Sequence, residues 1–150
     1  MLSKTIAREN FFKDLVRGKI VESVVLKHIQ KKYPSSCIID AFKGYDIWIP
    51  ELHKSIEVKY DPMSNETGNI LIEFEFDGKP SALMTTKADW WVFYDGSKFY
   101  MYEPMSIVYA IFLNKLQYVS IVGNGDIKEK KCFLIKKDEF FKHGKELKWN

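Results

Sequence analysis

The stretch KGYDIWIPELHKSIEVKY, residues 43–60, contains two short apolar runs on either side of a proline-containing turn. Residues 46–49 and 55–60 are rich in β-branched and aromatic side chains, a composition typical of strands. Because the turn between them is tight, the two strands are predicted to pair antiparallel. Both strands also carry charged residues where a plain strand would have threonine or valine.

These charged residues are Asp46, Glu57 and Lys59. We take Ile49 to face Lys54 across the turn. Counting back along both strands then places Asp46 opposite Glu57, with Cβ atoms about 4.5–5.5 Å apart, and Lys59 on the same face. Two facing carboxylates repel each other, so the pattern predicts a hard divalent cation such as Mg²⁺ between them. A solvent-exposed strand face of mixed charge is the alternative interpretation.

A long amphipathic helix is predicted before these strands, from about residue 10 to residue 32. Glu22 shares the apolar stripe that should be buried against the sheet. A buried, unpaired carboxylate is costly, so Glu22 is a candidate member of the same site. Gly18, one turn earlier, has no side chain and would let backbone or substrate approach. A structural ion pair between Glu22 and a lysine of the sheet is the alternative.

The rest of the chain is predicted to contain further strands and helices. Strands are expected at residues 37–42, 69–76, 90–94, 98–102, 118–122 and 132–135, and helices at 81–88, at 104–116 and from 137 onward. No repeat or linker interrupts this order, so residues 1–150 are predicted to form a single domain. We therefore expect an α/β fold, a three-layer-like sandwich with a central mixed sheet flanked by helices.

Composition and charge restrict the class of protein. The 150 residues are 46% hydrophobic and 15% aromatic, which is enough for one domain with a substantial core. The formal net charge of +3 permits a polyanionic partner without requiring one. The sequence shows no secretory signal and no apolar run near the roughly 18 residues of a membrane span. We therefore expect a cytoplasmic protein, inside the host cell if viral, with no membrane partner.

The order and spacing of the candidate site residues resemble the PD-(D/E)xK nuclease superfamily, which has the restriction-endonuclease-like fold. The resemblance covers roughly residues 10–95 and consists of Gly18 and Glu22 on the helix, Gly44-Tyr45-Asp46 opening one strand, and Glu57-Val58-Lys59 in the next. Archaeal-type Holliday junction resolvases are similar in this order and spacing. Tyr45 stands where the literal motif has proline, which is a common variation.

This resemblance implies an αβββαβ core and a metal-dependent DNA endonuclease. Asp46 and Glu57 would bind Mg²⁺ or Mn²⁺ together with the backbone carbonyl of Val58. Lys59 would position the attacking water, and Glu22 would complete the site directly or through water. DNA is then the expected partner, and restriction, junction-resolving, repair and phage roles all remain open. A non-catalytic nucleic-acid-binding or assembly protein with the same fold is the alternative.

Cutting both DNA strands would call for a symmetric homodimer, which is therefore also expected. A small-molecule enzyme using the same carboxylates is a third option. It has no glycine-rich phosphate loop or cofactor motif in its support.

The segment GNILIEFEFDGKPSALMTTKAD, residues 68–89, is similar to a segment of virus- and phage-type nucleases, in which an acidic strand precedes a Ser/Thr-rich turn. Glu73 is therefore expected near the metal site, and a salt bridge on an exposed face is the alternative. Ser81, Thr86 and Lys87 are candidates for binding the phosphate backbone of DNA, as hydroxyls and lysines commonly do. A capping role for Ser81 is equally compatible with its position.

Two further groups of residues have two interpretations each. Trp90 and Trp91 are able to stack on bases, but their apolar strand favours a position in the core. A basic rim toward DNA or a solvated loop would account for the lysines at positions 128, 130, 131, 136 and 137.

Overall fold

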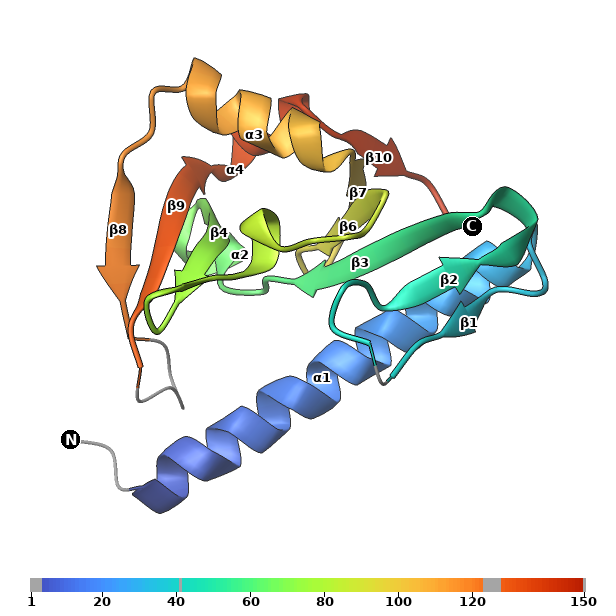
Figure 1. The fold of residues 1–150 in the computed structure, drawn as a ribbon, viewed down its shortest axis with the longest axis horizontal. Coiled ribbons are helices and arrows are strands. Elements are labelled where there is room, and N and C mark those ends of the chain that lie inside the picture. Colours follow the sequence, from blue (N-terminus) through green and yellow to red (C-terminus); the bar gives the residue numbers. More distant parts are fainter. Residues whose placement is uncertain (1–3, 41, 123–127, 150) are drawn as a thin grey trace.

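The structure, a computed structural model, describes residues 4–40, 42–122 and 128–149 (Figure 1). Its helices, strands and 3₁₀ turns follow in this order: α1 Lys4–Gln30, β1 Cys37–Ile38, β2 Ile47–Ile49, η1 Pro50–Leu52, β3 Lys54–Tyr60, α2 Ser64–Thr67, β4 Asn69–Phe76, β5 Lys79–Pro80, η2 Ala82–Met84, β6 Trp90–Tyr94, β7 Phe99–Tyr102, α3 Pro104–Leu113, β8 Tyr118–Ile121, β9 Lys130–Lys136, α4 Lys137–Lys142 and β10 Lys145–Leu147. The α/β class predicted from the sequence is confirmed.

The strands form two sheets rather than the single central sheet that the sequence predicts. A mixed sheet has the order β1-β2-β3-β6-β7-β10, in which β3 and β6 are parallel neighbours. An antiparallel sheet has the order β5-β4-β9-β8. The predicted strand at residues 69–76 has the expected bounds but pairs along its length with β9. Its apolar residues Ile70 and Ile72 pack with Trp91 of the mixed sheet, so β4 covers that sheet instead of extending it.

Helix α1 packs against the mixed sheet through its second half. Val21, Val25 and Ile29 are buried there with Ile56 and Val92 of the sheet. The 27 residues of α1 span about 40 Å, whereas the seven residues of β3 span about 23 Å. The first half of α1 therefore extends past the strands, as Figure 1 shows.

The predicted burial of the apolar stripe is consequently wrong for this first half of α1. Leu15, which belongs to that stripe, is 47% exposed, and the neighbouring apolar residues Val16 and Ile20 are 57% and 58% exposed.

The other face of the mixed sheet packs against the antiparallel sheet, α3 and α4. Trp91 and Phe93 of β6 meet Ile107 of α3 and Phe140 of α4 in this second core. The indole N–H of Trp91 donates to the Thr86 hydroxyl at 2.9 Å, so this buried donor is satisfied. The prediction that Trp91 is a core residue is therefore confirmed.

Within the described ranges, no helix combines the length and the apolar character needed to cross a lipid bilayer.

Candidate active site

The register of β2 and β3 is the predicted one over the strands themselves. Ile49 faces Lys54 and Ile47 faces Ile56. Beyond Ile47 the regular pairing stops, because the N–H of Asp46 also donates to the carbonyl of Ile56, at 2.9 Å. Two residues therefore share one partner on β3, as they do in a β-bulge. Asp46 lies outside the ladder, and the predicted regular pairing with Glu57 does not extend to it.

The offset at Asp46 directs its side chain onto the backbone of β3. Asp46 Oδ2 accepts a hydrogen bond of 2.7 Å from the N–H of Val58, the residue between Glu57 and Lys59. Burial raises the pKa of Asp46 above its ordinary value, although the Val58 N–H and the charge of Lys59 oppose this. The carboxylate is therefore fixed beside the Glu57-Val58-Lys59 segment and is held there in an unfavourable environment.

Glu57 and Lys59 project from the same face of β3 and form an ion pair. Their Nζ and Oε1 atoms are 2.8 Å apart, and the two side chains are 34% (Lys59) and 17% (Glu57) exposed. The ammonium group also lies 5.1 Å from the ring centre of Trp91 on the neighbouring strand. Burial raises the pKa of Glu57 despite the charge of Lys59, and the charges of Asp46 and Glu22 raise it further.

Glu22 lies on the sheet side of α1, within electrostatic reach of the other two acids. Burial and the charge of Asp46 raise its pKa, while Lys19 opposes them. Its ion-pair partner is Lys19 on the same helix, at 3.2 Å, and Lys19 also reaches Asp40 at 3.3 Å. Glu22 therefore has an ion-pair partner, but this lysine belongs to α1 and not to the sheet, as the alternative interpretation had it.

No described backbone of another element lies close to Gly18, so that part of the prediction is wrong, while the approach of a substrate stays a prediction. A Cβ atom placed on it would meet no atom within 4 Å. Gly18 instead lines a cavity of about 320 Å³ between α1 and the end of β3, together with Val58 and Lys59.

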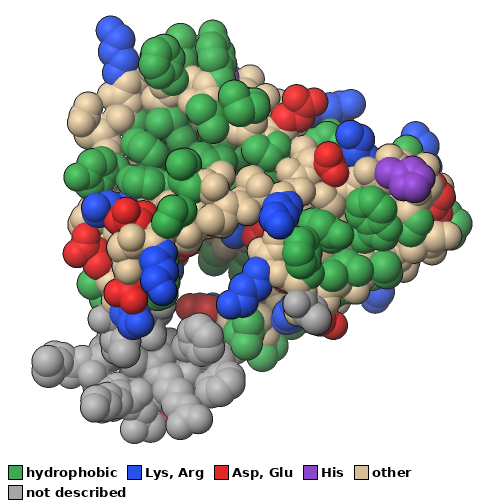
Figure 2. Space-filling view, viewed as in Figure 1, with side chains coloured by type: hydrophobic (Ala, Val, Ile, Leu, Met, Phe, Trp, Pro, Cys, Tyr) green, Lys and Arg blue, Asp and Glu red, His purple; other side chains and the backbone are tan. Residues whose placement is uncertain are grey.

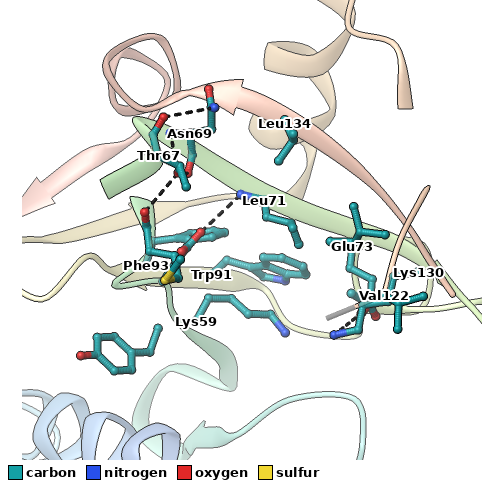
Figure 3. A pocket seen from close by; sticks show the side chains of 15 residues that line it. Lys59, Thr67, Asn69, Leu71, Glu73, Trp91, Phe93, Val122, Lys130 and Leu134 are labelled. Atoms are coloured by element: carbon teal, nitrogen blue, oxygen red, sulfur yellow. Dashed lines mark hydrogen bonds and ion pairs between the residues drawn. The ribbon is translucent and has the colours of Figure 1, made fainter. Parts of the chain in front are cut away.

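A larger cavity, of about 690 Å³, lies between the two sheets beside Lys59 (Figure 3). Lys59 and Trp91 line it from the mixed sheet, and Glu73 and Lys130 line it from the antiparallel sheet. Figure 2 shows the molecule hollowed between the antiparallel sheet and α1, with Lys and Arg side chains on both sides. The Lys59 side of the candidate site is therefore reached from an open depression with cationic groups on its walls.

Glu73 lies across this cavity from Lys59, on the facing sheet. It accepts a hydrogen bond of 2.7 Å from the Ser81 hydroxyl and pairs with Lys130 at 3.7 Å. Glu73 therefore has the salt bridge of the alternative interpretation, but it lies on a cavity wall and not on an exposed face. The Ser81 side chain makes no capping hydrogen bond to η2, so the capping alternative for Ser81 is wrong.

The other predicted phosphate contacts are used inside the protein or lie on its surface. The Thr86 hydroxyl accepts hydrogen bonds from the Trp91 indole and from the N–H of Ala88, at 3.2 Å. The exposed Lys87 lies over the ring of Phe42, with its Nζ 5.7 Å from the ring centre. A phosphate-binding role for Ser81, Thr86 and Lys87 stays a prediction.

Most lysines of the predicted basic rim have acidic partners. Lys128 pairs with Asp77 at 2.8 Å, Lys131 with Glu75 at 3.0 Å and Lys137 with Asp95 at 2.7 Å. Sequence reasoning treated Lys130 only as a member of this rim and missed its place in the cavity wall. The pairing of β4 with β9, which brings Lys130 to Glu73, has no signal in the local sequence pattern.

The structure thus brings Asp46, Glu57 and Lys59 together and leaves Glu22 coupled to them through charge. In the part of the chain that the structure describes, no group of three or more His, Cys, Asp or Glu side chains is arranged to hold a metal ion by itself. Comparisons with protein-family models, with curated proteins and with solved structures give no match. The function is therefore inferred from the side chains of the site.

Proposed function

We propose that this chain is a metal-dependent endonuclease that hydrolyses phosphodiester bonds in DNA. The observation that supports it is the crowding of two half-buried carboxylates, Asp46 and Glu57, beside the ammonium group of Lys59. Burial raises the pKa of both acids, and the charge of Asp46 further raises that of Glu57. Stability alone does not favour such a cluster, whereas clustered acids with perturbed pKa values are common at catalytic sites.

The donor atoms of this cluster fit Mg²⁺ or Mn²⁺. Mg²⁺ is usually held by one or two carboxylates, with water and substrate phosphate oxygens completing its coordination. Asp46 and Glu57 supply two carboxylates, and the family resemblance adds the carbonyl of Val58. When bound, a divalent cation lowers the pKa of a water molecule and offsets the charge of the phosphate. It would also relieve the repulsion that raises the pKa of Glu57.

The position of Lys59 beside Glu57 supports a role in acting on the attacking water. In the structure it donates to Glu57, and its ammonium group lies against the face of Trp91, which holds it in place. If Glu57 bound a cation instead of Lys59, the ammonium group of Lys59 would be able to donate to a water molecule and to a phosphate oxygen. It would then stabilise the negative charge that develops during hydrolysis.

The DNA backbone is expected to enter through the depression between the two sheets. Lys59 and Lys130 place cationic groups on its opposite walls, and positive charge is what attracts the phosphate backbone. Ser81, Thr86 and Lys87 are the further candidates for phosphate contacts. A homodimer would allow both strands of a duplex to be cut.

A non-catalytic nucleic-acid-binding or assembly role is the second candidate. It is favoured by the fact that Glu57 and Glu22 already have lysine partners, at 2.8 and 3.2 Å. A binding protein of this kind would retain DNA without any requirement for a divalent cation.

A cleavage assay distinguishes the two candidates. Supercoiled plasmid, duplex, single strands and a four-way junction are incubated with the purified chain, with Mg²⁺ or with a chelator. We expect cleavage of at least one substrate with Mg²⁺, and none by the Asp46→Asn or Glu57→Gln variants. Asp138→Asn, an exposed acid on α4, is the matched control and should cut normally. Equal DNA binding with and without Mg²⁺, with no cutting, would instead favour the binding role.

A further inference from the structure

Helix α3 exposes an unusually large apolar surface. Its ten residues, PMSIVYAIFL, include no charged residue, and Ile107 and Ala110 are buried in the core beneath it. A helix that is apolar on every side is normally covered on every side. The α3 patch is the set of exposed residues Met105, Val108, Tyr109, Phe112 and Leu113, which are 71%, 41%, 57%, 81% and 55% exposed.

The α3 patch lies on the outside of the molecule. Figure 1 shows α3 at its upper edge, and Figure 2 shows hydrophobic side chains gathered over the same region. An apolar groove of about 630 Å³ continues it, lined by Leu83, Met84 and Phe133 beside α3. A contiguous apolar surface of this kind marks an interaction site in most proteins.

The area of the patch is close to what one partner contributes to a stable complex. With 150–250 Å² for an aromatic side chain and somewhat less for an aliphatic one, the exposed parts of the patch amount to roughly 600 Å². A standard interface takes about 800 Å² from each partner. The α3 patch alone therefore supplies most of this area, and the adjoining apolar groove extends it.

The charges at the two ends of α3 indicate what the partner is. Glu103 precedes the helix and Lys115 follows it; both are exposed, and neither has an ion-pair partner among the residues that the structure describes. Each stands six residues from Tyr109 in the chain, or about 9 Å along a helix axis. Two copies of α3 crossing antiparallel at Tyr109 would bring Glu103 of each copy to Lys115 of the other.

We propose that the α3 patch is the contact surface of a homodimer, in which two α3 helices pack antiparallel across a two-fold axis at Tyr109. An isologous contact brings each surface against itself, so it requires a patch free of like charges and complementary at its ends. The α3 patch meets both conditions. This inference does not depend on the proposed nuclease activity.

The exposed apolar residues of α1 do not suit the same role. Val16 and Ile20 are similarly exposed, but residues 13–31 contain five Lys or Arg and two Asp or Glu. Two copies of this helix face would bring an excess of positive charge together, which opposes self-association. The α1 face is therefore the natural control surface for a test of the α3 patch.

The test is the molecular mass of the full chain in solution, measured by analytical ultracentrifugation over a wide range of concentration. We expect the mass of two chains, against 17.7 kDa for one. Phe112→Asp should raise the dimer dissociation constant on the order of 30-fold, the loss typical of a central aromatic contact. Ile20→Asp, the same kind of change at an exposed position of α1, should leave the dissociation constant unchanged. Circular dichroism establishes that each variant is folded.

A charge exchange tests the antiparallel arrangement. Glu103→Lys and Lys115→Glu should each weaken the dimer, because each brings like charges together at both ends of the contact. The double variant restores opposite charges and should recover the dimer. A monomer at every concentration, or a dimer that Ile20→Asp breaks and Phe112→Asp does not, would overturn the proposal. A dimer that the double variant fails to restore would also overturn it, as would a stable complex formed only with a different protein.

Discussion

Asp46 binds the backbone of Val58 through its side chain while its own N–H binds Ile56, so one residue makes two contacts to the neighbouring strand. The first contact holds a negative charge at the segment that carries Glu57 and Lys59. The second marks the point where the regular ladder of β2 and β3 ends. Asp46 therefore belongs to the candidate site because it lies where the regular ladder of β2 and β3 ends.

Removal of the Lys59 ammonium group should reduce cleavage without unfolding the protein. Lys59→Met keeps a long side chain beside Trp91 but loses the donors, and a positioned proton-transfer group contributes about 10²–10⁴-fold to rate. Single-turnover cleavage with Mg²⁺ measures the loss. Lys145→Met, at an exposed lysine of β10, is the control and should cut at the normal rate. Undiminished cleavage by Lys59→Met would remove this residue from the mechanism.

Divalent cations should stabilise the fold through Asp46 and Glu57. A ligand that binds only the folded state at 100 times its Kd adds about 2.7 kcal/mol to the free energy of unfolding. The Tm of the wild-type chain should therefore rise with Mn²⁺ or Mg²⁺. The Tm of the Asp46→Asn, Glu57→Gln double variant should not rise, whereas Asp138→Asn should behave as wild type. An equal rise in all three proteins would place the cation elsewhere.

The free energy of unfolding of the metal-free chain should fall as the pH rises, because three of its acids have raised pKa values. Burial raises the pKa of Glu22, Asp46 and Glu57, so the folded state holds their protons more tightly than the unfolded state does. Stability due to these groups is therefore present at low pH and is lost as the pH rises through and above about 4. Urea denaturation against pH should show a weaker decline for Glu57→Gln than for wild type. An unchanged slope would contradict the raised pKa of Glu57.

The ion pair of Lys137 with Asp95 should contribute strongly to stability. Burial alone would raise the pKa of Asp95, but Lys137 and the N–H groups of Lys98 and Ser97 hold it below its ordinary value. Asp95 is 4% exposed, so its charge would be left without its cation in Lys137→Met, at a cost of about 2 kcal/mol. Urea denaturation at neutral pH measures this, with the neighbouring Lys136→Met as control. The difference between the two variants should disappear in acid, where Asp95 is protonated.

The two halves of α1 should respond differently to truncation. Val25→Ala creates a cavity at a fully buried position and should cost about 2 kcal/mol of unfolding free energy. Val16→Ala, the same change at a position that is 57% exposed, should cost less than about 0.5 kcal/mol. Equal losses would mean that the first half of α1 is covered in solution.

The sequence was sufficient for the pairing of β2 with β3. A short turn fixes the register, and a side-chain period of two then fixes the faces, so Ile49 and Lys54 were correctly placed opposite each other. The offset at Asp46 could not be predicted in this way. The carbonyl of Asp46 also accepts a hydrogen bond from the N–H of Ile39, directly after β1, and the pattern of two strands does not contain such a third contact.

Strand bounds were also easier to predict than strand partners. The alternation at Asn69–Phe76 gave β4 its observed bounds, but its partner β9 begins at Lys130, far along the chain. Strand β10, Lys145–Leu147, was missed because its sequence KEL contains no β-branched or aromatic residue. The strand β10 forms because it pairs antiparallel with β7. The helix predicted at 81–88 is reduced to the 3₁₀ turn Ala82–Met84, which two β-branched residues, Thr85 and Thr86, follow.

The part of α1 that extends past the strands adjoins the candidate site. Val21 is the first buried residue in the part of α1 whose side chains are described, and Glu22 follows it directly, so the acid lies where the exposed and the buried parts of the helix meet. A partner bound to the exposed part of α1 would therefore lie directly beside the acid whose pKa is raised by burial and by the charge of Asp46.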